Sequence, residues 1–180
     1  EGAAGYYNIQ PDVMAFGKII GGGLPVGAYA SSAEIMSCVA PEGPVYQAGT
    51  LSGNPVAMSA GIAQLKNCLQ LGFYESLKEK TDHLVLTINT YAESKGYGFK
   101  MFSVGSIFWL SFGHADKVRA MHEINGDEVK KFAPFHAALL ERGVYLGPSG
   151  YEVGFVSAAH SQEDLEKTIA HFKEALDIVF

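Results

Sequence analysis

The sequence predicts an α/β protein in which the end of a large α/β domain is followed by a small α+β domain. Residues 1–70 are rich in glycine and small side chains. An amphipathic helix is predicted over 72–95, where apolar side chains recur at helical spacing. The chain beyond it alternates strand and helix patterns. We therefore expect a large-domain part over 1–70, an interdomain helix over 71–96 and a small C-terminal domain over 97–180. The helix stripe consists of Leu77, Leu84, Ile88 and Tyr91.

Two local patterns predict elements in the first part. The run Val13 to Phe16 is apolar and ends at Gly17, which predicts a short buried strand. Asn54 followed by Pro55 marks a helix start, because asparagine caps the first amides and proline suits the first helical position. We expect this helix to continue to about Leu69.

Strands and helices of the C-terminal part follow from alternation and turn residues. Strands are predicted over 99–104 and 107–112, joined at Gly105-Ser106. A helix is expected at about 127–142, bent or restarted at Pro134. Short strands follow at 144–146 and 153–156. The last helix should be capped by Ser161 and carries one ordinary core stripe, formed by Leu165, Ile169, Phe172, Leu176 and Val179.

Composition excludes several kinds of partner. The net charge of −6 and a pI near 5.5 argue against nucleic acid, because neutralising phosphates requires clustered Lys and Arg. No apolar run approaches the roughly 20 residues of a membrane span, and no signal peptide is visible. Cys38 and Cys68 form no CxxC pair, and the six histidines are scattered, so no metal site is predicted. A cytoplasmic protein with free thiols is the simplest expectation.

Lys18 is the most informative residue of the chain. It follows Gly17 and precedes an Ile-Ile-Gly-Gly-Gly run, so a planar ligand or another backbone segment can approach closely. A lysine desolvated in such a place has a lowered pKa, and its neutral amine is a nucleophile for carbonyl carbon. The alternative is a lysine at a strand end with its ammonium in water.

A second candidate site precedes the helix that starts at Asn54. Gly49, Thr50 and Ser52 lie just before it, and free backbone N–H groups and hydroxyls at a helix N-terminus bind anions such as phosphate. The alternative is a capped loop that binds nothing. It is not a Walker loop, because no Gly-Lys-Ser/Thr follows. A nucleophilic Lys18 beside a phosphate loop suits pyridoxal 5′-phosphate, whose aldehyde forms a Schiff base with lysine.

The segment 11–28, which contains Lys18, resembles the cofactor-lysine region of the class III aminotransferases. That resemblance implies the C-terminal part of a fold-type I transferase that uses pyridoxal 5′-phosphate and pyridoxamine 5′-phosphate. The chain begins at Glu1 without a methionine and runs at once into this region. We therefore expect it to be the interior of a longer protein.

Three further segments are similar to the glutamate-1-semialdehyde aminomutase branch of this family. They are 43–55, 141–149, in which Gly147 replaces the more usual alanine, and 151–160, which carries Glu152. Related aminotransferases tend to have an arginine there, whereas this chain has none after Arg142. The resemblance implies conversion of glutamate 1-semialdehyde to 5-aminolevulinate for porphyrin biosynthesis.

The resemblance also implies roles for individual residues. Lys18 would hold the cofactor and move protons, and Glu152 would lie near the substrate amines. Gly49 and Thr50 would bind the cofactor, with Thr50 contacting the phosphate of the neighbouring subunit, which implies a homodimer with shared active sites.

Three alternatives remain open. The chain is also compatible with a class III ω-aminotransferase. Ser157 and His160 suggest a hydrolase pair, but no Gly-x-Ser-x-Gly elbow surrounds Ser157. The third alternative is an inactive structural piece of such an enzyme, and we expect the isolated chain to lack activity and to be cut first within residues 1 to about 50.

Overall fold

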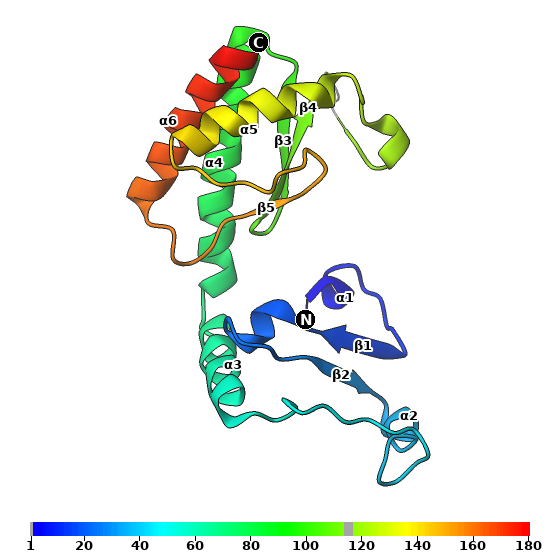
Figure 1. The fold of residues 1–180 in the computed structure, drawn as a ribbon. Helices are drawn as coiled ribbons and strands as arrows, with labels where there is room; N and C mark the ends of the chain where they lie inside the picture. The colour runs from blue at the N-terminus through cyan, green and yellow to red at the C-terminus, as the bar shows by residue number, and fades with distance from the viewer. Residues whose placement is uncertain (1, 114–116) are drawn as a thin grey trace. The chain divides into compact units, whose positions relative to one another are not determined.

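The computed structural model describes residues 2–113 and 117–180, which form two compact units (Figure 1). The first unit ends at Leu71, and the second is Gly72–Phe180. Each unit is described by itself. The helix expected to connect two domains, α4 (Phe73–Lys95), belongs to the second unit. Its role as an interdomain helix stays a prediction.

The first unit is built on a two-stranded antiparallel ribbon. Strand β1 pairs with β2 so that Val13 faces Ser31 and Phe16 faces Ala28. The chain reverses between them after Gly22 and Gly23, whose φ angles of +57° and +92° are ones that glycine adopts readily. The elements in order are α1 (Gly2–Tyr6), β1 (Val13–Phe16), the 3₁₀ helix η1 (Lys18–Gly21), β2 (Ala28–Ser31), α2 (Ala33–Met36) and α3 (Pro55–Cys68).

Helix α3 begins where the sequence predicts. The Asn54 side chain accepts hydrogen bonds from the amides of Val56 at 3.1 Å and Ala57 at 3.2 Å. Pro55 has no amide hydrogen, so the first helical position leaves no donor unsatisfied. The helix ends at Cys68, one residue before the predicted end.

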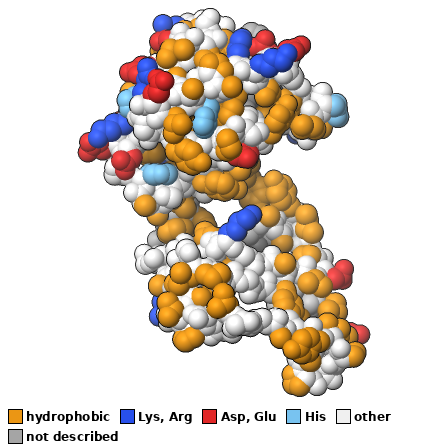
Figure 2. Space-filling model, viewed as in Figure 1, with side chains coloured by type: hydrophobic (Ala, Val, Ile, Leu, Met, Phe, Trp, Pro, Cys, Tyr) orange, Lys and Arg blue, Asp and Glu red, His pale blue; other side chains and the backbone are white. Residues whose placement is uncertain are grey.

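The prediction that β1 is buried is wrong for this chain. All four of its residues are exposed, and Figure 2 shows hydrophobic side chains over the surface of the first unit. Among its described residues only Ala57 and Cys68 are buried hydrophobics. The physical reason is that a two-stranded ribbon has no second layer to cover it, so an apolar strand stays in contact with solvent.

The second unit has a three-stranded antiparallel sheet in the order β3-β4-β5. The strands predicted over 99–104 and 107–112 are confirmed, and they are joined at Gly105 with φ +58°. The elements in order are α4, β3 (Phe99–Val104), β4 (Ile107–Phe112), the 3₁₀ helices η2 (Met121–Glu123) and η3 (Glu128–Lys131), α5 (Phe132–Glu141), β5 (Gly154–Phe155) and α6 (Gln162–Val179).

Helices α4, α5 and α6 pack with this sheet around one hydrophobic core (Figure 1). The predicted stripes are confirmed: Leu84 and Ile88 of α4 and Phe172 of α6 are all buried. Phe135 of α5 meets Phe172 edge to face, with ring centroids 5.3 Å apart. Among the described helices, none is both long enough and apolar enough to cross a membrane.

Two predictions for the segments that flank α5 need correction. No strand forms over 144–146, because Gly143 at φ +80° turns the chain and the Val144 amide donates to Leu139 O at 2.9 Å, closing the end of α5. The strand predicted over 153–156 shortens to Gly154–Phe155. The helix predicted at about 127–142 divides into η3 and α5, with Pro134 in the first turn of α5.

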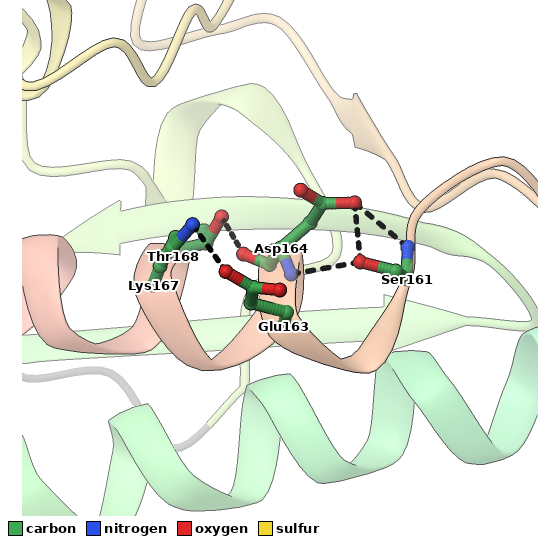
Figure 3. A network of polar contacts seen from close by, with 5 residues as sticks. All are labelled: Ser161, Glu163, Asp164, Lys167 and Thr168. Atoms are coloured by element: carbon green, nitrogen blue, oxygen red, sulfur yellow. Dashed lines mark hydrogen bonds and ion pairs between the residues drawn. The ribbon is translucent and has the colours of Figure 1, made fainter.

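The predicted cap of α6 is confirmed as a reciprocal capping box (Figure 3). The Asp164 amide donates to Ser161 Oγ at 3.1 Å, and the Ser161 amide donates to Asp164 Oδ2 at 2.8 Å. The Ser161 hydroxyl and amide hold the pKa of Asp164 below its usual 3.8. Lys167 forms an ion pair with Glu163 at 2.6 Å on the next turn.

A carboxylate joins the C-terminal turns of α4 and α6. Asp177 accepts hydrogen bonds from the hydroxyls of Tyr91 and Tyr97, each at 2.8 Å. The hydrogen bond to Asp177 is the main cause that raises the pKa of each tyrosine above 10.0, with a smaller contribution from burial. The same bonds, that from Tyr91 first, lower the pKa of Asp177 below 3.8.

Candidate active site

Lys18 lies where strand β1 passes into η1, and its backbone is strained. Gly17 is extended at φ −160°, and Lys18 then takes φ +53°. The only other described non-glycine residue with positive φ is Asn8, a type that tolerates this region well. Strained residues persist where the surrounding structure fixes them and are enriched at functional sites. The backbone therefore singles out the same lysine as the sequence.

The predicted desolvation of Lys18 is not provided by the described residues. Its side chain is exposed, and a Cβ added to the neighbouring Gly17 would have no atom within 4 Å. Within this chain the side chain of Lys18 is in contact with solvent, as in the alternative interpretation. The physical reason is the one that exposes β1: the first unit has no layer over this side of the ribbon. The cofactor role of Lys18 stays a prediction.

Two glycines hold η1 against helix α3. A Cβ on Gly61 would lie 2.6 Å from Ile20 O, and a Cβ on Gly22 would lie 2.6 Å from Ala60 O. Any larger side chain at either position would push the two backbones apart. The turn that begins at Lys18 is thus fixed on α3, the helix whose N-terminus follows Thr50.

The anion site predicted before α3 has to be revised. The first two amide hydrogens of α3 already pair with the Asn54 side chain, so they are not free to bind phosphate. The turn before them is closed by the Ser52 amide donating to Gly49 O at 2.9 Å. Among the described residues, no partner satisfies the Thr50 amide or hydroxyl, and Thr50 is exposed. Any anion contact here belongs to the turn and Thr50, not to the helix end.

An open groove of about 630 Å³ lies beside this turn. It brings Gly49 and Ser52 next to Tyr29 of β2 and Met58 of α3. Lys18 is not among its lining residues. The first unit therefore fixes Lys18 on a turn that packs on α3 and places Gly49 at the groove, without placing the lysine there.

Glu152 lies in the second unit, in a turn where its amide donates to Ser149 O at 3.0 Å. Its side chain is exposed, and among residues 2–113 and 117–180 nothing pairs with its carboxylate. It adjoins Gly147 and Val153, which line an open groove of about 530 Å³ between the 142–147 segment, β5 and α6. This carboxylate is available to a cation.

Ser157 and His160 do not form a nucleophile and base pair. The His160 ring nitrogen Nδ1 accepts a hydrogen bond from the Ser157 amide at 3.1 Å. Among the described residues, no hydrogen bond joins the Ser157 hydroxyl to either nitrogen of the His160 ring. The hydrolase alternative therefore has no support in the geometry.

Sequence reasoning did not identify α3 as the partner of the glycines around η1. The Gly-Gly-Gly run was predicted to admit a planar ligand or another backbone segment, and at Gly22 the neighbour is the backbone of α3. Gly61 gave a second signal, because glycine inside a helix is unfavourable unless another backbone comes near.

The model of the family described as Aminotransferase class-III matches residues 2–176. The chain belongs to the class III aminotransferase family. It is a family of enzymes that use pyridoxal phosphate, and the predicted fold class is confirmed.

Solved structures support this assignment. The chain resembles an ω-transaminase from Sphaerobacter thermophilus with 28% identity and a TM-score of 0.87, covering 99% of this chain and 41% of that one. A β-phenylalanine aminotransferase from Variovorax paradoxus shows 26% identity and a TM-score of 0.83, with coverage of 96% and 40%. A glutamate-1-semialdehyde-aminomutase from Pseudomonas aeruginosa shares the fold, at 24% identity, a TM-score of 0.80 and coverage of 99% and 42%. This chain spans about two fifths of the length of each.

Proposed function

We propose that this chain is the lysine-bearing part of a pyridoxal-phosphate-dependent aminomutase that converts glutamate 1-semialdehyde to 5-aminolevulinate. The observation that carries the proposal is the unpaired, exposed carboxylate of Glu152 in a segment that has no arginine. A carboxylate attracts the ammonium groups of a diamine and repels the second carboxylate of a dicarboxylic substrate.

The residues of the first unit fit the cofactor. Lys18 offers an exposed amine on a turn fixed against α3, and Thr50 offers an amide and a hydroxyl with no partner among the described residues. When bound, the cofactor withdraws electrons from the carbon that carries the substrate amine. Lys18 would bind the carbonyl carbon through Nζ and carry a proton at that atom. Gly49 and Thr50 would bind a cofactor as well, with Thr50 contacting the phosphate of the cofactor in the neighbouring subunit.

Borohydride reduction tests the role of Lys18. A full class III enzyme that carries this sequence, reduced in the presence of pyridoxal phosphate, should yield a peptide with a pyridoxyl group on Lys18. Lys66, in the last turn of α3, is the matched control and should stay unmodified. A pyridoxyl group on another lysine, or on none, would contradict the cofactor assignment.

The reaction itself separates the aminomutase from its main competitor. The enzyme should form 5-aminolevulinate from glutamate 1-semialdehyde with no added amino donor or keto acceptor. The Glu152→Gln variant keeps the shape of the side chain and removes its charge, so kcat/KM should fall about 10- to 100-fold.

The second candidate is a class III ω-aminotransferase. It is favoured by the 28% identity to the Sphaerobacter thermophilus ω-transaminase, which exceeds the 24% identity to the Pseudomonas aeruginosa aminomutase. An absolute requirement for an external keto acid, with release of the transaminated product, would decide for this candidate.

We also propose a cytoplasmic homodimer with shared active sites. The support is the exposed Thr50, whose donors are free to meet a phosphate held by another subunit, and the exposed apolar surface of the first unit. Mixing a Lys18→Ala subunit with a Thr50→Ala subunit should restore part of the activity, because one of the two sites would then be intact. No recovery in verified mixed dimers would contradict shared sites.

A further inference from the structure

Asn125 is followed by Gly126 in the exposed turn that leads into η3. It is the only one of the five asparagines in the sequence that precedes a glycine. Both residues are exposed, and a Cβ added to Gly126 would have no atom within 4 Å. The backbone nitrogen of Gly126 can therefore approach the Asn125 side chain without hindrance from a side chain of its own or from the surrounding structure.

The hydrogen bonds around Asn125 favour attack on its side-chain carbonyl. The Oδ1 atom accepts from the amide of Asp127 at 3.1 Å and from that of Glu128 at 3.4 Å. Such donors stabilise the negative charge that this oxygen takes up when a nucleophile adds to Cγ. Among the described residues, nothing pairs with Asn125 Nδ2 or with the amide hydrogen of Gly126, so the leaving group and the nucleophile are both free.

We propose that Asn125 is a site of spontaneous deamidation in the folded chain. The Gly126 nitrogen gives its proton to water and bonds to Asn125 Cγ, and the bond from Cγ to Nδ2 breaks, so that ammonia leaves with a proton taken from water. Water then opens the cyclic imide that has formed. Opening at Cγ gives aspartate, whereas opening at the backbone carbonyl gives isoaspartate. Water is the only co-reactant, and nothing is oxidised or reduced.

Isoaspartate removes the cap of η3. The side-chain carbonyl that accepts from Asp127 and Glu128 becomes part of a main chain that is longer by one carbon. The backbone carbonyl of Asn125, which accepts from the Val129 amide at 3.1 Å, becomes a carboxylate outside the main chain. Since η3 is only four residues long, its first turn depends on these bonds.

A loosened η3 affects the turn at Gly150. This glycine is buried, and a Cβ added to it would lie 3.1 Å from Phe132 and 3.3 Å from Val129, so η3 and the start of α5 pack directly on the turn. The carbonyl of Gly150 accepts the indole hydrogen of Trp109, with 3.0 Å between nitrogen and oxygen. Trp109 therefore reports on the modification from the opposite side of the turn.

The reaction is followed by mass spectrometry at neutral pH on the whole chain, beside a peptide of residues 119–131 that sets the rate of this sequence without its fold. Peptide mapping should locate the exchange of an amine for a hydroxyl at Asn125, and a methyltransferase specific for isoaspartate should label the same peptide. Asn67, which is exposed and precedes a cysteine, should stay unmodified in the same samples.

Gly126→Ala is the matched variant for this measurement. It adds a methyl group in open space and leaves Asn125 in place, so the fold should be kept and most of the conversion should be lost. Unchanged conversion in Gly126→Ala would contradict attack by the Gly126 nitrogen. A folded chain that is still unmodified at Asn125 when the peptide has converted completely would overturn the proposal.

The structural effect is measured on the isoaspartate form after chromatographic separation. The chain has one tryptophan, so its indole N–H gives one resonance, which should shift, and the Val129 amide should exchange faster with solvent. Asn125→Asp is the control, because aspartate has the same charge and caps equally well on an ordinary backbone, so both signals should stay close to those of the parent chain. Equal behaviour of the isoaspartate form and Asn125→Asp would overturn the effect on η3 and the turn.

Discussion

Replacing Phe172 by alanine should destabilise the second unit strongly. The Phe172 side chain is fully buried, and its ring packs edge to face on Phe135 at 5.3 Å. Truncating a buried phenylalanine costs about 3–5 kcal/mol, which combines lost transfer free energy with the cavity left behind. At about 4 °C per kcal/mol for a domain of this size, the thermal midpoint should fall by about 12–20 °C.

Thermal unfolding followed by tryptophan fluorescence reports on the second unit, because the single tryptophan lies there. Trp109 of β4 is half-buried and donates to Gly150 O at 3.0 Å, so its fluorescence follows unfolding of the sheet. Ile178→Ala on the same helix is the control, because Ile178 is 58% exposed and its truncation should cost less than about 0.5 kcal/mol. Equal losses for the two variants, or no loss for Phe172→Ala, would refute the assignment of the core.

Three further outcomes are expected. The hydrogen bonds of Tyr91 and Tyr97 to Asp177 should stabilise the fold between two pH limits. Their contribution is lost as the pH falls below 3.8 and Asp177 protonates through its lowered pKa, and as the pH rises above 10.0 and the tyrosines ionise through their raised pKa. Converting both tyrosines to phenylalanine should remove this contribution. Urea unfolding from pH 2 to 11 should thus show the largest difference from the parent chain on the plateau between these limits, and a constant difference would contradict it. Gly61→Ala gains about 1 kcal/mol of helix propensity, but its Cβ would lie 2.6 Å from Ile20 O, so hydrogen exchange in η1 should accelerate. Gly27→Ala is the control, because its Cβ would have its nearest atom at 3.8 Å, and hydrogen exchange in η1 should not change. Limited proteolysis with mass detection should cut within residues 1 to about 50 before it cuts the second unit, and equal protection in a verified monomer would refute the contrast between the units.

The elements that the sequence predicted correctly are those fixed by neighbouring residues. Ser161 and Asp164 cap α6 because they are three residues apart, and Asn54-Pro55 starts α3 for the same kind of reason. The hairpin of β3 and β4 needs only a tight turn at Gly105 between two apolar runs. Neighbouring residues determine each of these elements, so a single sequence is sufficient to predict them.

The predictions that were wrong depended on what lies across space. An apolar run such as Val13 to Phe16 is typical of a buried strand, but burial requires a covering layer that no local pattern specifies. Val144 to Leu146 has strand-like residues, yet the Val144 amide is used to close α5. The contribution of the helix end to the anion site was wrong for a similar reason, because the same Asn54 that marks the helix start also occupies its first amides. The phosphate contacts of Gly49 and Thr50 stay a prediction.

These two kinds of result bear directly on Lys18. Its placement is determined locally: Gly17 precedes it, its φ is +53°, and the Gly61 contact fixes the turn on α3. The reactivity of Lys18 is not determined locally, because a lysine amine becomes nucleophilic at neutral pH through desolvation or a neighbouring cation. The first unit buries only Ala57 and Cys68 among its described hydrophobic side chains, so it positions the amine without desolvating it. The groups that complete a reactive Lys18 must therefore come from outside the described residues of the first unit, and the adduct at Lys18 is expected in a full enzyme and not in the isolated chain.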